Sequence, residues 1–165
     1  MHPTLHQILH GPHSPAVLEM FQQSRWHSED RPGWPRTRRW KELFGGAEDQ
    51  FADDFLSRFA DVTASYLIGD DGDSYADIGE NEVKMLPMML LDCIDRAELD
   101  RFSQAAGERV VAVGDVNHNF LLLGSKGRFF ISVPSCGDLR CLGEGWDGLV
   151  NYLRGGDYTT ILNSK

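Results

Sequence analysis

Acidic side chains crowd into one stretch of the chain, residues 69–82. This stretch holds six carboxylates and no basic residue. Clustered carboxylates suit a hard cation such as Ca²⁺. The EF-hand spacing is absent, because a loop that starts at Asp71 or Asp73 places Ala76 or Ile78 where that motif has glycine. We therefore expect a solvated loop, with a charged docking surface as the sharper alternative, rather than a dedicated calcium site.

Histidines form a second candidate group near the N-terminus. Four of the six lie within the first thirteen residues: His2, His6, His10 and His13. The first three recur every four residues, so on a helix they would share a face able to bind a transition metal. Pro3, Gly11 and Pro12 interrupt the segment. We expect a mobile terminus over residues 1–13 and no metal site.

No nucleophile sits in a recognisable catalytic motif. The chain has no G-x-S-x-G sequence, and Gly143-Glu144-Gly145 lacks the third glycine of a phosphate-binding loop. His118 is the only histidine after residue 27 and reads as a loop residue between two asparagines. A pair of His118 with Cys136 is the remaining route to nucleophilic catalysis. We expect a protein without enzymatic activity and without a cofactor.

Basic and aromatic residues alternate over residues 25–41, which contain Trp26, Trp34 and Trp40. Such a pattern is typical of surfaces that bind single-stranded nucleic acid. The other interpretation is that the indole rings enter the core while the arginines balance the acidic region. The acidity of the whole chain favours this second interpretation.

Composition limits the class of partner. The 165 residues include 25 acidic and 16 basic ones, for a net charge of −9, and 41% are hydrophobic. This charge disfavours direct nucleic-acid binding and suits a basic protein partner. The three cysteines, Cys93, Cys136 and Cys141, indicate a reducing compartment rather than a disulfide framework. We see no membrane span and no secretory signal, and we expect a cytoplasmic protein.

The helices and strands that must position these residues are predicted from the spacing of hydrophobic residues and from the glycines, prolines and capping residues between them. Helices are expected over residues 14–24, 47–59, 92–106 and 142–156, and strands over residues 62–68, 109–114, 119–123, 128–133 and 139–142. Ser125-Lys126 forms the centre of a hairpin, and the apolar stretch 83–91 enters the core. The pattern predicts an α+β fold with a single antiparallel-rich sheet flanked by helices. We expect one domain over residues 14–156, followed by a tail over residues 157–165.

Three patches resemble a known family. They are Gly33-Trp34-Pro35-Arg36-Thr37-Arg38, Phe55-Leu56-Ser57-Arg58-Phe59, and the succession of strand, hairpin, strand and capped helix from Ala106 to Gly155. Together they resemble the SUKH superfamily (the Smi/Knr-type proteins), in particular its third subgroup. The chain departs from the family pattern at Ala60-Asp61, where two glycines are usual, and at Ala112, where proline is common.

The resemblance implies a non-enzymatic immunity protein that binds and neutralises a cognate bacterial toxin, with no catalytic residues to carry over. Many such toxins act on nucleic acid and are expected to be basic, so an acidic face would cover their active-site cleft. The predicted contact residues are Asp70, Asp71, Asp73, Tyr75, Asp77, Glu80 and Glu82. Two alternatives stay open: a regulatory or scaffolding domain of the same fold with a cellular partner, and a small hydrolase with an unrecognised site.

Overall fold

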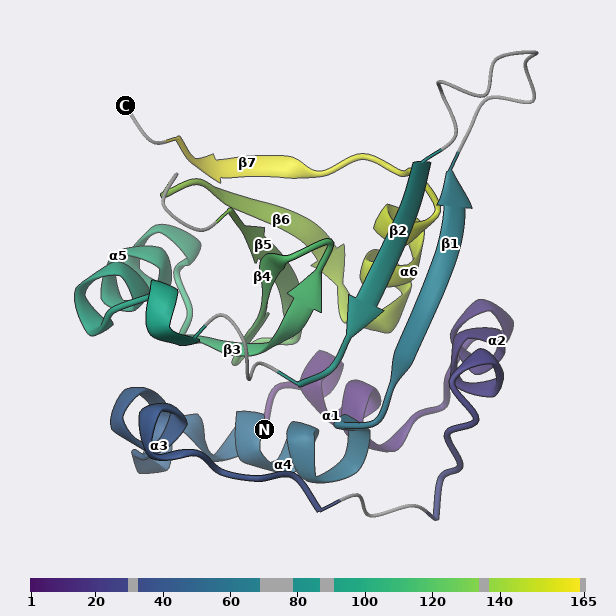
Figure 1. The fold of residues 1–165 in the computed structure, drawn as a ribbon, viewed down its shortest axis with the longest axis horizontal. Helices are drawn as coiled ribbons and strands as arrows, with labels where there is room; N and C mark the ends of the chain where they lie inside the picture. Colours follow the sequence, from purple (N-terminus) through teal and green to yellow (C-terminus); the bar gives the residue numbers. More distant parts are fainter. Residues whose placement is uncertain (30–32, 69–78, 87–90, 134–136, 164–165) are drawn as a thin grey trace.

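One antiparallel sheet organises the molecule. The computed structural model describes residues 1–29, 33–68, 79–86, 91–133 and 137–163. Its seven strands pair in chain order: β1 (Thr63–Ile68), β2 (Gly79–Lys84), β3 (Val110–Val116), β4 (Asn119–Gly124), β5 (Arg128–Ser132), β6 (Leu139–Glu144) and β7 (Thr159–Leu162). Every neighbouring pair is antiparallel. Figure 1 shows this sheet with helices around it, which confirms the predicted α+β class.

Six α-helices flank the sheet within the described residues. They are α1 (Pro3–His10), α2 (Pro15–Gln23), α3 (Arg38–Phe44), α4 (Gln50–Phe59), α5 (Arg96–Ala106) and α6 (Gly145–Leu153), and two short 3₁₀ turns, η1 (Ala47–Asp49) and η3 (Leu91–Cys93), precede α4 and α5. Ser14 caps α2 by accepting a hydrogen bond from the Val17 amide, as Ser14-Pro15 predicts. Gly107 ends α5 in the left-handed conformation, with φ of 71°.

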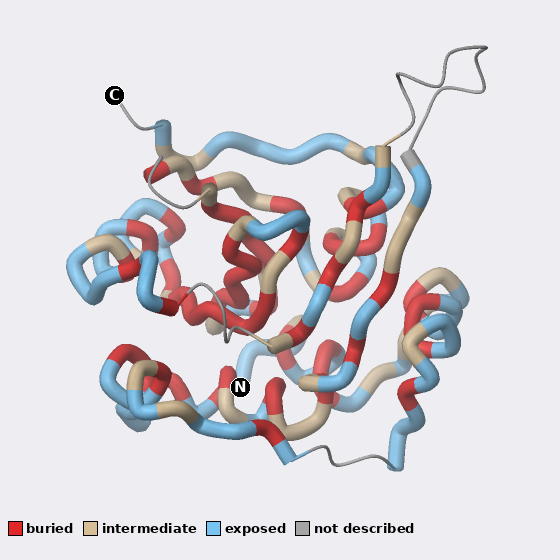
Figure 2. Tube along the Cα trace, in the orientation of Figure 1, coloured by how far each residue is buried: buried red, intermediate tan, exposed pale blue. Residues whose placement is uncertain are grey.

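The core forms where α1, α2, α4 and α6 meet strand β5. An aromatic cluster fills this region, and its members are Phe21, Trp26, Phe55, Phe59, Phe129 and Trp146. All six are buried, as are Trp34 and Trp40. Figure 2 shows buried residues gathered on the helices and strands that face the inside of the molecule. The interpretation of the tryptophans as core residues is therefore confirmed. Arg36 pairs with Asp53 of α4 rather than with the acidic region that it was expected to balance.

The N-terminal segment corrects a prediction. Residues 3–10 form helix α1, and its Leu5, Ile8 and Leu9 are buried rather than mobile. Pro3 occupies the first turn and Gly11 follows the last residue, so the residues taken as interruptions mark the two ends of the helix. The Trp146 indole donates a hydrogen bond of 3.0 Å to the Ile8 carbonyl and fixes α1 against α6.

Three other boundaries also differ from the predictions. The expected loop over residues 69–82 gives way to strand β2 at Gly79, and part of the expected tail forms the edge strand β7. The final helix begins at Gly145 because residues 142–144 still belong to β6. Gly114 allows β3 to pass close to β2, since a Cβ there would lie 2.2 Å from the Lys84 carbonyl oxygen.

Candidate interaction surface

The predicted contact residues divide into two groups. Glu80 and Glu82 lie in strand β2, whose ladder with β1 ends at the pair Ile68 and Gly79. The other five, Asp70, Asp71, Asp73, Tyr75 and Asp77, lie outside the described residues. The described part of the predicted surface is therefore the two-stranded ribbon β1–β2.

Alternation gives the ribbon two different faces. Ala64 pairs with Val83 on the inner face, and both are buried. The outer face carries three cross-strand pairs: Thr63 with Lys84, Ser65 with Glu82, and Leu67 with Glu80. The carboxylates of β2 thus point to solvent because the residues between them point to the core. We name these six outer residues the ribbon face.

An exposed apolar side chain distinguishes the ribbon face. Leu67 is 79% exposed, the highest value among the large hydrophobic residues that the structure describes, and Glu80 directly opposite is exposed as well. Glu82 is paired with Lys84 at 3.1 Å, and this hydrogen bond raises the pKa of Lys84. The positive charge of Lys84 is therefore offset at the base of the ribbon. The outer end combines an apolar group with an acidic one, as interface anchors and their polar rims do.

Side-chain amides hold the ribbon in place. The Asn81 Nδ2 donates to the Leu153 carbonyl at 3.0 Å, and its Oδ1 accepts from the Asn117 Nδ2 at 2.6 Å. The Glu82 amide donates to the Asn117 Oδ1 at 2.8 Å. Sequence reasoning missed both asparagines. The only signal for Asn117 is its place in a turn, where it adopts a left-handed φ of 53°.

The outer edge of β1 is closed at one point by helix α2. The Gln23 Oε1 accepts from the Ser65 amide at 2.6 Å, and its Nε2 donates to the Ser65 carbonyl at 3.1 Å. These two bonds satisfy backbone groups that would otherwise be open to another strand. This point of the β1 edge is therefore closed to pairing with a further strand.

Two arginines are paired with carboxylates that are buried inside the molecule. Arg109 forms a two-pronged pair with the buried Asp49, at 2.7 and 3.2 Å. Arg128 donates one hydrogen bond to the buried Glu108 carboxylate and another to the Ala106 backbone carbonyl. Exposed carboxylates such as Glu80 contribute to the field that a partner meets.

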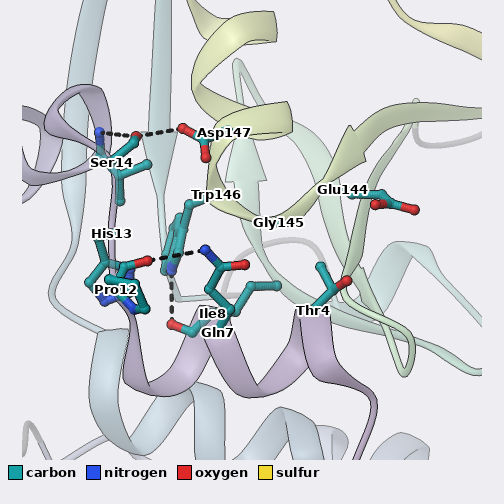
Figure 3. Close-up of a pocket in the computed structure, with 11 residues that line it drawn as sticks. Thr4, Gln7, Ile8, Pro12, His13, Ser14, Glu144, Gly145, Trp146 and Asp147 are labelled. Carbon is teal, nitrogen blue, oxygen red and sulfur yellow. Dashed lines mark hydrogen bonds between the residues drawn. The ribbon is translucent and has the colours of Figure 1, made fainter.

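A cavity of about 150 Å³ near the Ser14 hydroxyl and His13 is the catalytic alternative (Figure 3). It lies between α1, the α1–α2 connection and the start of α6. The Ser14 hydroxyl donates to Asp147 at 2.5 Å and accepts from the Val17 amide, so it caps α2 and joins it to α6. Burial lowers the pKa of His13, and the nearby Arg58 lowers it further. The Ser14 hydroxyl thus donates its hydrogen bond to the Asp147 carboxylate and not to the His13 imidazole. This arrangement connects α2 with α6 and does not activate a nucleophile.

The remaining chemical candidates are dispersed. His118 is exposed in the β3–β4 turn, and Cys136, its expected partner, lies outside the described residues. Cys93 is exposed and Cys141 half-buried, both with free thiols. In the part of the chain that the structure describes, no three His, Cys, Asp or Glu side chains come together as a metal site. None of the described helices has both the length and the apolar character needed to cross a bilayer.

No protein-family model, curated protein or solved structure matches the chain. The likeness to the SUKH superfamily therefore stays a prediction carried by the three sequence patches.

Proposed function

We propose that this chain is a SUKH-type immunity protein that binds and neutralises a basic bacterial toxin without catalysis. The observation that carries the proposal is the exposed Leu67 opposite the exposed Glu80, at the end of the ribbon that leads into the acidic residues 70–77. The reducing compartment indicated by the cysteines places this activity in the cytoplasm.

Two physical effects support the proposal. Carboxylates on the ribbon face and in residues 70–77 attract a basic cleft and speed the encounter with it. Leu67 then contributes affinity by leaving water in the bound state. A regulatory or scaffolding domain with a cellular partner would need an equally basic partner, because the same charges face it.

Co-expression is the direct test of the proposed function. Toxin genes adjacent to the gene for this chain would be expressed with and without it, and growth would be followed. We expect the chain to relieve the growth arrest caused by one of them. The scaffolding alternative would be favoured if the chain relieved the growth arrest of none of the adjacent toxins and instead captured a cellular protein that has no toxic effect.

Matched charge variants test the surface. The test variant neutralises Asp70, Asp71, Asp73, Asp77 and Glu80, and the control neutralises the exposed Glu29, Asp54, Asp61, Asp92 and Asp157. Both variants lose five negative charges, so only their positions differ. We expect the test variant to slow association with the toxin by about tenfold or more at low salt and to flatten its salt dependence. Equal kinetics for the two variants would discard the assignment of this surface.

Leu67 is tested separately with Leu67→Ser. We expect faster dissociation with little change in association rate, because an apolar anchor acts after the encounter. Leu18→Ser, at a half-exposed leucine of helix α2, serves as the control. An unchanged dissociation rate for Leu67→Ser would exclude this side chain from the interface.

A further inference from the structure

Helix α1 changes the meaning of the N-terminal histidines. Their spacing predicts a shared face only if the segment is helical, and the structure forms a helix from Pro3 to His10. His6 and His10 are both exposed on it, four residues apart. Side chains at this spacing are neighbours on a helix surface.

The two imidazoles lie close together. Their ring centroids are 4.8 Å apart, with an angle of 50° between the ring planes. Imidazole nitrogens are common ligands of Zn²⁺, and a pair spaced by four residues on one helix is the arrangement found in helical zinc motifs. The pair thus presents two ligands of the correct type on one side of the helix.

The backbone beneath the pair is held firmly. The opposite face of α1 buries Leu5, Ile8 and Leu9, and the Ile8 carbonyl accepts the indole hydrogen bond of Trp146. The backbone of α1 therefore loses little conformational freedom when a metal ion binds to the two histidines. His2 is engaged differently, because its Nδ1 accepts a hydrogen bond from the Thr4 amide at the start of the helix.

The surroundings indicate binding rather than catalysis. The segment reads His6-Gln7-Ile8-Leu9-His10, with glutamine where the helical zinc-protease motif has its general base. The side-chain Nε2 of Gln7 donates instead to the Pro12 carbonyl at 3.1 Å. His10 also lines a shallow cavity of about 230 Å³ together with the acidic Asp54 and the basic Arg58.

We propose that His6 and His10 form a surface chelate for a divalent transition-metal ion such as Zn²⁺. Among the described residues no third His, Cys, Asp or Glu joins them, so water or a group from another molecule completes the coordination. This site lies on α1 and does not depend on the ribbon face or on the proposed function.

Isothermal titration of the full, tag-free chain with Zn²⁺ tests the proposal. We expect one equivalent to bind in the micromolar range. His6→Gln and His10→Gln should each weaken binding by about tenfold or more, because each removes one of two protein ligands. His118→Gln, which changes an exposed histidine in a distant turn, is the matched control and should bind as the parent does.

Several results would overturn the chelate. One is the absence of Zn²⁺ binding by the parent chain, and another is binding that persists when both histidines are replaced. A larger loss for His2→Gln than for His6→Gln would place the metal at the chain start instead. Circular dichroism of each variant shows whether α1 is kept, and a variant that binds Zn²⁺ weakly while fully folded supports the proposal.

Discussion

Asp49 and Glu108 place carboxylates where water does not reach, and each depends on one arginine. The Asp49 side chain is fully buried, and the Arg109 side chain is 16% exposed. Removing a guanidinium from such a pair leaves an uncompensated charge, which costs far more than losing a pair at the surface. These arginines therefore join distant segments, since Asp49 lies in η1 and Arg109 directly precedes β3.

Arg109→Met should lower the free energy of unfolding by about 3–5 kcal/mol. Arg38→Met is the control, because Arg38 pairs with Glu42 at the surface within one helix, and its cost should stay within about 0.5 kcal/mol. Urea titration followed by tryptophan fluorescence measures both values. Similar costs for the two variants would show that burial of Asp49 does not matter.

His13 gives the fold a dependence on pH. Burial lowers its pKa below the ordinary 6.5, Arg58 lowers it further, and Asp147 acts in the opposite direction. The unfolded chain therefore binds a proton at His13 more readily than the folded chain does. The stability of the fold that depends on a neutral His13 is present above about pH 6.5 and is lost as the pH falls. Burial raises the pKa of Glu98 and Asp115. The folded chain binds protons at these two carboxylates more readily than the unfolded chain does, so these two groups favour the folded chain as the pH falls.

His13→Gln isolates this contribution. The loss of stability between about pH 7.5 and pH 5.5 should be smaller in the variant than in the parent, because glutamine does not titrate in this range. Denaturant titrations at the two pH values measure the difference. Equal losses would mean that His13 titrates alike in the folded and unfolded chain.

At the scale of elements, helix α1 is part of the core. Ile8→Ala should cost about 2–5 kcal/mol, because it opens a cavity between α1 and α6. Leu18→Ala, at a residue that is 47% exposed, should cost less than about 1 kcal/mol. Chemical denaturation compares them. A negligible cost for Ile8→Ala would restore the prediction of a mobile N-terminus.

Glycines at turns and at a helix end predicted the elements whose boundaries depend on neighbouring residues in the sequence. The β4–β5 hairpin follows from Gly124 and Gly127, and helix α5 ends at Gly107 as expected. Helix α1 was missed because Pro3 and Gly11 read as breaks, although a proline in the first turn and a glycine after the last are compatible with a helix.

The candidate surface was only partly predictable. The acidic character of Glu80 and Glu82 is visible in the sequence, but their place in a strand depends on pairing with β1. The supports of the ribbon join residues 36 and 72 positions apart, Asn81 with Asn117 and Asn81 with Leu153. The exposure of Leu67 likewise depends on which face of the ribbon meets the core. No local pattern contains these contacts.

At the scale of the whole molecule, a single core predicts a single unfolding transition. The buried hydrophobic residues form one cluster that includes Trp26, Trp34, Trp40 and Trp146. Tryptophan fluorescence and far-ultraviolet circular dichroism should therefore report the same urea midpoint. Separate midpoints would show that part of the chain unfolds on its own.

The bond from Trp146 to the Ile8 carbonyl joins residues 138 positions apart. A ribosome that adds about 5–20 residues per second takes roughly 7–28 seconds to cover that distance. During this interval the apolar side of the first helix has no indole ring to cover it, and chaperones meet it as unfolded surface. The order of synthesis thus makes α6 a late step in folding, because only the edge strand β7 follows it in the chain, and a nascent chain that stops short of α6 leaves the core incomplete.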